Sequence, residues 1–373
     1  DEYVTSEVHQ SYIEPIGCVA SYQSDGKLVI ILSTQDPFSA RSVVSQMLNL
    51  PESKVRVVQA FMGGGFGGKA DAPTKCALIC SVLSIKTGRP VKMVYDREEE
   101  FLATRPRLGM KIKVKTGVKS DGTLLAREST IVADAGAYAG VSPSILIVGA
   151  MRSDNLYRLK NVKIDATLVY TNNTPHGAYR GYGNPQMTFA TEAQIDKIAE
   201  KLWMDPIELR LKNATRAGDV TVHGWKIKKI GLVECIEEVA KLADWKSRKE
   251  TYRPHGALRR GVGVACGVHC TSSRSKPVVA STAIIKISRR DGSVTVITGH
   301  ADIGAGQNTV FAQIASEVLG VPMEKISVVR ADTDISPFGA PTTGDRATLV
   351  GGNAVRIAAE DVVRQLFEAA SPI

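Results

Sequence analysis

The chain has 373 residues, of which 43% are hydrophobic and 23% charged, as in an ordinary globular protein of two or three domains. It contains no uncharged apolar run of about 18 residues, and its polar first ten residues do not resemble a secretion signal, so we expect neither a membrane span nor export. The net charge of +9 would suit nucleic acid, but the basic residues are scattered and no aromatic residues interleave with them, so we expect a solvated basic surface.

The first 245 residues predict strands that alternate with helices. Runs of β-branched residues indicate the strands, and Gly88 and Pro90 stop one of the helices. The expected strands are 27–33, 55–61, 91–95, 110–116, 124–133 and 162–170, and the expected helices are 41–50, 71–86, 191–202 and 206–213. We assign this part to a first mixed α/β domain, 1–245.

The composition changes between residues 246 and 260, which include six Lys or Arg residues. We predict a linker there and a second, partial domain at 261–373. Its expected strands are 261–268, 283–288 and 294–298, and its expected helices are 306–319 and 352–369. The fold class is therefore α+β, with two mixed domains.

The six cysteines are too few for a disulfide scaffold in a chain of this length, which favours a reducing, cytoplasmic location. Cys76 and Cys80 stand four apart in an expected helix and should face one core. Cys266, His269 and Cys270 resemble metal ligands in their spacing, but no second ligand pair accompanies them. We favour core packing there, with a metal site as the alternative.

A glycine run, FMGGGFGGK at residues 61–69, lies between an expected strand and an expected helix. Its backbone N–H groups, with a helix start behind them, favour an anion or polar ligand. A P-loop would need Ser or Thr after Lys69, where Ala70 stands, so a P-loop nucleotide hydrolase is a weaker alternative. A dinucleotide fingerprint and a purely structural turn remain open.

The same run resembles the signature of the molybdopterin-binding large subunit of the xanthine oxidase/aldehyde oxidase family. The resemblance implies that Gly65, Phe66 and Gly67 lie beside molybdenum. Upstream, the sequence STQ that ends at Gln35 resembles a family turn whose Gln hydrogen-bonds an oxo ligand. An amide N–H₂ can donate to an oxo group without adding charge.

A second segment, GAYRGYGNPQ at 177–186, resembles the family's A-[FM]-R-G-[FY]-G-x-P-Q sequence. The resemblance places Arg180 at the molybdenum pocket and Tyr182 beside the substrate. The alternative is that Arg180 pairs with a carboxylate and Tyr182 packs in the core.

Two segments of the second half complete the resemblance. Residues 302–309 are similar to the family's G-Q-G turn that holds the pterin, through Gly304, Gly306 and Gln307, although Ala305 stands where the family has Gln. Residues 341–355 resemble the next family segment. There the resemblance gives Thr342 and Thr343 as donors, and it places Gly344 around molybdenum with Gln35, Phe66 and Arg180.

The resemblance implies a molybdopterin cofactor, in the cytosine dinucleotide form, and partner subunits that carry [2Fe-2S] clusters and FAD. We expect heterotrimers that form a higher oligomer, without nucleic acid or a membrane span. The sequences of these motifs most resemble those of the hydroxybenzoyl-CoA reductase and xanthine-dehydrogenase-like branches of the family.

Two departures concern the substrate. Purine-oxidising members carry Glu at the position of Ala70 and Arg near Val148, or near Arg152 if the alignment slips by a turn. An uncharged pocket favours an aromatic, aldehyde or other heterocyclic substrate.

The family's general-base Glu, in a GxGE turn, and its amino-terminal small domain are not represented. We therefore expect a fragment that is inactive alone, with a non-catalytic scaffold as the alternative.

Overall fold

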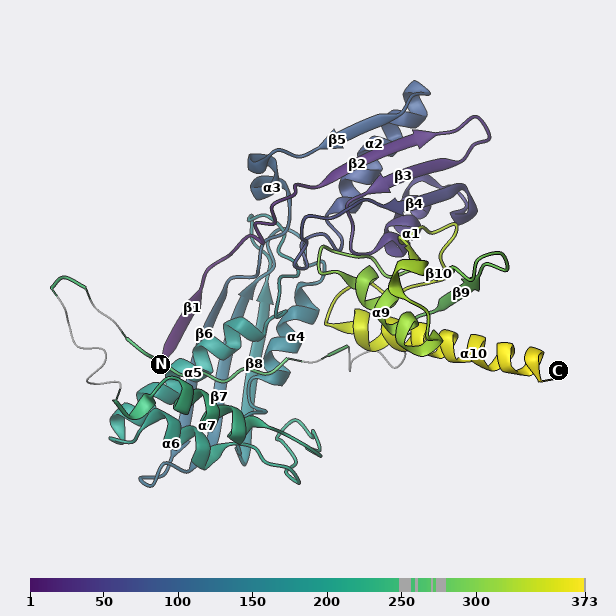
Figure 1. The fold of residues 1–373 in the computed structure, drawn as a ribbon. Helices are drawn as coiled ribbons and strands as arrows, with labels where there is room; N and C mark the ends of the chain where they lie inside the picture. Colours follow the sequence, from purple (N-terminus) through teal and green to yellow (C-terminus); the bar gives the residue numbers. More distant parts are fainter. Residues whose placement is uncertain (248–255, 259–260, 270, 273–279, 372–373) are drawn as a thin grey trace. The chain divides into compact units, whose positions relative to one another are not determined.

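The computed structural model describes the chain except residues 248–255, 259–260, 270, 273–279 and 372–373 (Figure 1). It contains two compact units that are both discontinuous in sequence. Unit 1 comprises Asp1–Val8, Arg107–Gly177 and Gly181–His269, and unit 2 comprises His9–Pro106, Ala178–Arg180 and Cys270–Ile373. Most of the linker expected at 246–260 lies outside the described residues, so that boundary stays a prediction.

Unit 1 is built on a four-stranded sheet of order β1-β6-β7-β8. Its strands are β1 (Glu2–Thr5), β6 (Met110–Val118), β7 (Leu124–Asp134) and β8 (Asn161–Val169). Helices α4 (Ser142–Arg152) and α5 (Asn184–Lys201) contact each other and pack on the sheet (Figure 1). In β6, Met110, Ile112 and Val114 are buried and the lysines between them are exposed, the alternation of a strand with one covered face.

Helix α5 begins at Asn184, earlier than the expected 191, because Pro185 occupies the first turn, where proline is tolerated. Helices α6 (Pro206–Asn213) and α7 (Leu232–Leu242) complete the helices of unit 1 within the described residues.

The strand predicted at 261–268 is wrong, because residues 261–269 pair with no other strand. Val262 and Val264 of this segment pack beside a cluster that contains Ile236 and Trp245. The backbone N–H of Cys266 donates to Glu192 Oε2 over 2.8 Å, so a side chain replaces the sheet ladder as its partner. Cys266 is buried as predicted, whereas Cys270 lies outside the described residues.

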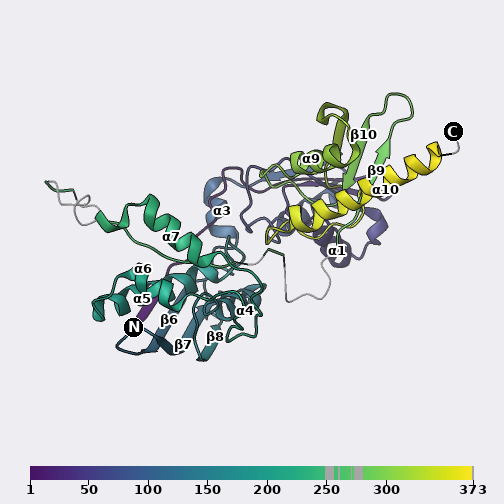
Figure 2. The same ribbon diagram turned by 60° about the horizontal axis from the view of Figure 1, so that its bottom comes forward.

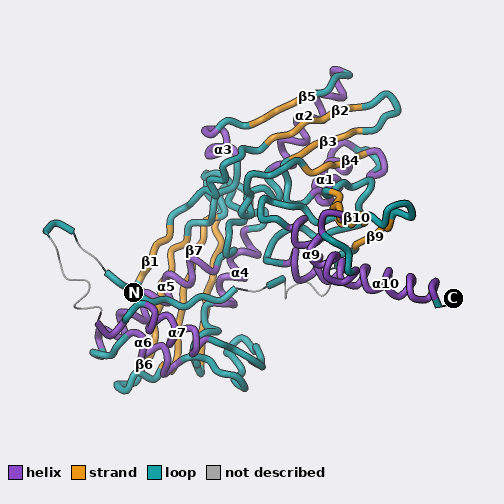
Figure 3. Tube along the Cα trace, in the orientation of Figure 1, coloured by secondary structure: helices purple, strands orange, loops and turns teal. Residues whose placement is uncertain are grey.

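Unit 2 contains two sheets, of orders β4-β3-β2-β5 and β11-β10-β9. The strands are β2 (Gly17–Tyr22), β3 (Leu28–Leu32), β4 (Val55–Gln59), β5 (Val91–Val94), β9 (Ala283–Ile287), β10 (Val294–Thr298) and β11 (Ile326–Val329). The helices are α1 (Pro37–Leu48), α2 (Pro73–Thr87), α3 (Arg97–Ala103), α9 (Gln307–Leu319) and α10 (Asn353–Ala370). Helices α9 and α10 contact the strands of the sheet β11-β10-β9, as Figures 2 and 3 show.

The cores follow the apolar faces of these elements. Cys18, Cys76 and Cys80 are all buried in one cluster with the inward residues of β2 and β3, which confirms the prediction for the latter two cysteines. Gly88 ends α2 in the left-handed conformation, with φ of 65°, also as the sequence predicts. The α+β class is confirmed.

Unit 2 repeats one arrangement of elements. An antiparallel hairpin is followed by a helix, a 3₁₀ turn and a strand parallel to the second strand of the hairpin. The first repeat is β2-β3-α1-β4 and the second is β9-β10-α9-β11. An Asp-Gly turn lies between the hairpin strands of each repeat, at Asp25 and at Asp291.

Candidate functional site

Four loops of unit 2 carry most of the residues that the sequence analysis singled out. Each loop follows the carboxyl end of one of the paired parallel strands β3, β4, β10 and β11. They carry Gln35, residues 65–67, residues 304–307 and residues 342–344 in that order. Loops at the carboxyl ends of parallel strands are the usual ligand-binding region of α/β sheets.

Gln35 joins three of these segments. Its side chain is buried, its Nε2 donates to the carbonyl of Thr342 over 2.9 Å, and its Oε1 accepts the N–H of Gly67 over 2.9 Å. Its backbone N–H donates to the carbonyl of Lys69, and its carbonyl accepts the N–H of Thr342. One side chain thus fixes the glycine loop and the segment that follows β11 with respect to the end of β3.

The glycines of the loop have no room for side chains. A Cβ at Gly65 would lie 2.6 Å from Gln35 Oε1, and one at Gly67 would lie 2.9 Å from the carbonyl oxygen of Ala178. Gly67 has φ of +101°, and Phe66 itself has φ of 49°, an uncommon conformation for a residue with a side chain. The loop is therefore closely surrounded and conformationally specified.

Three consecutive backbone donors of this loop are open. Within the described residues, the N–H groups of Gly64, Gly65 and Phe66 have no hydrogen-bond partner. Unpaired N–H groups in succession make a cradle for an anion or an oxo group. Gln35 Nε2 carries a second N–H beside the one that Thr342 accepts, so it could add a donor.

The turn that precedes α9 is organised differently. The carboxylate of Asp302 accepts the N–H groups of Gly304, Gly306 and Asn308 at 3.0, 3.2 and 3.3 Å. The chain's own anion therefore occupies the donors at the start of this helix, where a phosphate could otherwise bind. Two side-chain oxygens nearby can still accept hydrogen bonds. Gln307 Oε1 and Asn308 Oδ1 are buried and have no partner within the described residues.

His300 lies in the same loop, is 1% exposed, and has no partner for either ring nitrogen in the described part of the chain. Burial and the charge of Arg346 lower the pKa of this imidazole to about 4. The ring is therefore neutral at pH 7, with one N–H and one lone pair to offer.

Thr342, Thr343 and Gly344 form the fourth loop. The hydroxyl of Thr342 donates to the carbonyl of Ala301 over 2.8 Å, and its N–H donates to the carbonyl of Gln35. Both donors of Thr342 are therefore already used in bonds within the protein. The N–H of Thr343 donates to Pro341 within a turn, and Gly344 has φ of 59°.

The remaining candidates divide between the units. Arg180 belongs to unit 2, its N–H donates to the carbonyl of Phe66 over 2.9 Å, and its side chain is exposed. Ala70 is half-buried and its N–H donates to Gly67. Tyr182 and Val148 belong to unit 1, where Tyr182 packs beside a hydrophobic cluster and Val148 is half-buried in α4.

The sequence motifs assign no role to Glu14, Asp302 or His300. Asp302 begins the segment 302–309, and an Asp just before a glycine turn and a helix is a signal for capping. Glu14 accepts the N–H of Gly63 at the start of the glycine run, but it belongs to no motif, so only this contact reveals it.

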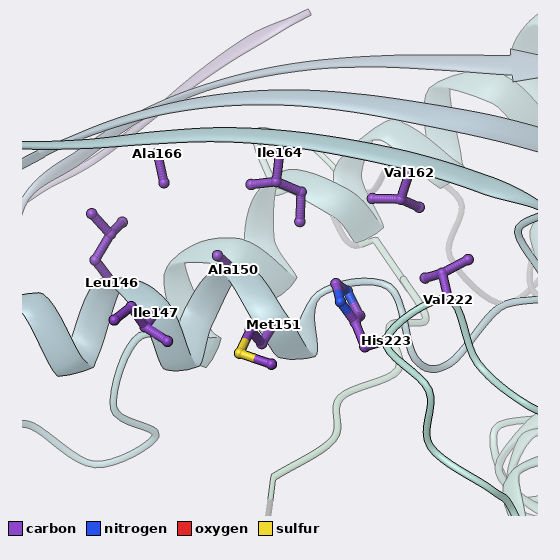
Figure 4. A pocket seen from close by; sticks show the side chains of 9 residues that line it. All are labelled: Leu146, Ile147, Ala150, Met151, Val162, Ile164, Ala166, Val222 and His223. Carbon is purple, nitrogen blue, oxygen red and sulfur yellow. The ribbon is translucent and has the colours of Figure 1, made fainter. Parts of the chain in front are cut away.

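Two features of unit 1 carry none of the cofactor residues. An open groove of about 370 Å³ lies between α4 and β8. Figure 4 shows the apolar side chains that line it, with His223 at one end.

Glu7, Asp134 and His176 form a polar cluster, the one group of potential metal ligands found within the described residues. The carboxylate of Asp134 already accepts bonds from Gly136, Thr171 and Asn173, which indicates a structural role.

Among the described residues, none of the helices is long and apolar enough to cross a membrane.

Comparisons with known proteins give the family of the chain. Two models, both described as molybdopterin cofactor-binding domain, match residues 1–214 and 236–373. A putative xanthine dehydrogenase molybdenum-binding subunit of Escherichia coli is 38% identical over 363 residues, which are 96% of this chain and 48% of that protein. An aldehyde oxidoreductase of Megalodesulfovibrio gigas is 34% identical over 98% of this chain and 40% of its own length.

Solved structures give the same result. The aldehyde oxidoreductase from Desulfovibrio gigas matches with a TM-score of 0.89 and 29% identity, over 100% of this chain and 42% of that chain. Quinoline 2-oxidoreductase from Pseudomonas putida matches with a TM-score of 0.87 and 28% identity, over 97% and 48%. The chain spans about half the length, or less, of these relatives. It belongs to the molybdopterin cofactor-binding family of xanthine dehydrogenase and aldehyde oxidoreductase large subunits.

Proposed function

We propose that this chain holds the molybdenum cofactor of a hydroxylase or dehydrogenase. The observation that carries the proposal is a row of three N–H groups, at Gly64, Gly65 and Phe66, that have no partner in the part of the chain that the structure describes. They lie next to the uncharged amide of Gln35. This donor set fits oxo and hydroxyl ligands, because it offers hydrogen bonds without a competing charge. When bound, the cofactor would supply the redox chemistry.

The chain's own residues would bind and orient that group. Gln35 would donate its second amide N–H, the loop around Phe66 would donate backbone N–H groups, and Arg180 and Gly344 would complete the surroundings of the metal. Donors that are fixed in advance stabilise developing charge without reorganisation during the reaction. Gln35 is held at both ends of its amide, which supports this role.

The pterin would lie against Gly304, Gly306 and Gln307, with Thr342 and Thr343 nearby. The buried Gln307 Oε1 and Asn308 Oδ1 support a polar ligand there, since buried polar atoms normally have partners. The donors already bound by Asp302 argue against a phosphate at this particular turn. The cytosine dinucleotide form of the pterin rests on the family resemblance.

The activity and partners of the whole protein follow from the same resemblance. We propose cytoplasmic heterotrimers with an iron–sulfur subunit and an FAD subunit, assembled into a higher oligomer. The match to proteins named as molybdenum-binding subunits supports a multisubunit enzyme. Ala70, which stands where purine-oxidising members have Glu, favours an aromatic, aldehyde or heterocyclic substrate over a purine. No residue of this chain is proposed as the general base.

Metal and pterin analysis of the purified chain tests the proposal. We expect molybdenum and a fluorescent pterin oxidation product in the wild-type protein, and a severalfold lower content in Gln35→Leu, a variant of similar volume without the amide. Wild-type protein that is folded but takes up neither molybdenum nor pterin would contradict the proposal. Binding without turnover in the assembled complex would favour a non-catalytic scaffold.

A further inference from the structure

Lys69, the last residue of the glycine run, is buried. Its side chain is 0% exposed, its Nζ lies 2.7 Å from Glu14 Oε2, and it lies 4.7 Å from the centre of the Tyr12 ring. Burial lowers the pKa of the ammonium group, and the carboxylate of Glu14 opposes that shift. A lysine in this position cannot reach a ligand phosphate, which also argues against the P-loop alternative.

Glu14 binds the other end of the same loop. Its Oε2 accepts the N–H of Gly63 over 2.7 Å, and its own N–H donates to the carbonyl of Gly63 over 3.3 Å. A Cβ at Gly63 would lie 2.6 Å from the Cβ of Glu14. One carboxylate oxygen therefore joins the first glycine of the run to the lysine after its last glycine.

The residues behind this pair are also fixed. Tyr12 donates its hydroxyl to the buried carboxylate of Glu100 over 2.6 Å, and the N–H of Ile16 donates to the same carboxylate. The carbonyl of Lys69 accepts the N–H of Gln35. The Glu14–Lys69 pair is thus anchored on one side to the segment before β2 and on the other to the turn after β3.

We propose that Glu14 and Lys69 are positioning residues that close residues 63–68 into a fixed loop, so that the N–H groups of Gly64, Gly65 and Phe66 stay open for the cofactor. The loop needs such a closure because glycines have the largest backbone freedom to lose. Charge-assisted hydrogen bonds are the strongest that a side chain can provide. The inference rests on the proposed function only for the identity of the ligand.

Hydrogen–deuterium exchange of the full chain tests the closure without cofactor. The informative amides are those of Gly67 and Gly68, which donate to Gln35 Oε1 and to the carbonyl of Gly65. Glu14→Gln and Lys69→Met should each raise the exchange of these two amides by about tenfold or more, since that is the effect of losing about 1.4 kcal/mol of local stability. Lys69→Arg, which keeps the charge, should restore most of the protection. Strands β6 and β7, in the other unit, should exchange as in wild type.

The control variant is Glu52→Gln, which removes the partly exposed Arg41–Glu52 pair of the same unit. It should change neither the exchange of the loop nor the cofactor content. The double variant Glu14→Gln/Lys69→Met leaves no unpaired buried charge, so it is the folded reference if a single variant does not fold. Its loop should still exchange fast.

Molybdenum and pterin content of the same variants gives the second measurement. We expect it to fall with loop protection and to return in Lys69→Arg. Unchanged exchange in the double variant would overturn the inference, and so would fast exchange with full cofactor content. If wild-type protein binds no cofactor, the proposed function fails separately, while loop exchange still reports whether the pair closes the loop.

Discussion

The two repeats of unit 2 share one scaffold but differ in the loop between the second hairpin strand and the helix. In the first repeat this loop is residues 33–36, and in the second it is residues 299–306. The short loop presents one amide, Gln35, which bonds to neighbouring segments. The long loop wraps its backbone donors around its own Asp302 and leaves buried polar side chains open.

Equivalent positions show the same division. Counted from the Asp-Gly turns, Ile30 corresponds to Val296, and both are fully buried core residues. Thr34 corresponds to His300. Thr34 Oγ1 accepts the N–H of Asp36, whereas the His300 nitrogens have no partner within the described residues. The repeats thus retain the same core and differ in polar groups at the strand ends, where ligands would bind.

The largest effect on metal binding is expected from alanine at Gly65, in the loop after β4, and it is compared with alanine at Gly306, in the loop before α9. In Gly65→Ala, the new Cβ would push the Gln35 amide out of its two bonds, so we expect about tenfold less bound molybdenum in a folded protein. Gly306 has φ of +79° and no atom within 4 Å of a Cβ, so Gly306→Ala should lower stability by only about 1–2 kcal/mol. Metal content and urea unfolding of both variants measure this, and equal metal loss would contradict the distinction.

The largest effect on stability is the pH dependence that His300 gives to the second repeat. Its folded pKa is about 4, and its unfolded pKa is about 6.5. As the pH falls from about 6.5 to about 4, the unfolded chain therefore binds a proton that the folded chain excludes. Stability should fall by on the order of 3 kcal/mol over this window.

The matched variant is His300→Thr, which copies Thr34. The cavity should lower its stability at pH 7, but the loss of stability between pH 7 and pH 5 should be smaller than in wild type. An unchanged pH dependence of the urea midpoint would show that His300 does not carry the effect.

A smaller difference is expected between the two aspartates that cap the helices. The carboxylate of Asp36 accepts the N–H of Ser39, and the carboxylate of Asp302 accepts the N–H groups of Gly304, Gly306 and Asn308. We expect Asp36→Ala to cost about 1 kcal/mol of unfolding free energy. Asp302→Ala should cost about 2 kcal/mol, because three backbone donors of one turn lose the carboxylate that accepts them. Thermal or urea unfolding of each variant decides the order, and the reverse order would contradict it.

The smallest effect concerns the ends of the helices. Asn49 and Gly320 both adopt the left-handed conformation, with φ of 53° and 66°. Both residue types accept it, so Asn49→Gly and Gly320→Asn should each change stability by no more than about 0.5 kcal/mol. A large loss in Gly320→Asn, measured in the same unfolding assay, would mean that the second repeat has less room at this cap than the first.

The sequence predicts what depends on local chemistry. The strands β3, β4 and β10, the stop of α2 at Gly88 and the burial of Cys76 all follow from residue type and spacing. The prediction of a strand at 261–268 is wrong because Val262 and Val264 pack against a hydrophobic cluster around helix α7 and do not join a sheet. This packing depends on tertiary contacts that the local sequence pattern does not contain.

The candidate site divides in the same way. Gln35 and the glycines stand in recognisable motifs, and the structure brings their segments together. Whether these residues hold a cofactor stays a prediction. The contacts of Glu14 and the burial of His300, whose nitrogens have no partner among the described residues, could not be predicted. Both depend on segments that are distant in sequence.

The discontinuity of unit 2 has a consequence for the order of folding. The bond between Gln35 and Thr342 joins residues 307 positions apart, and residues 178–180 enter the same unit from the middle of the chain. On a ribosome, the surroundings of the glycine loop would therefore stay incomplete until Thr342 had been synthesised. Such long-range closure makes folding slow and leaves apolar strands uncovered in the meantime. We expect the chain to need a chaperone, and cofactor loading to follow synthesis.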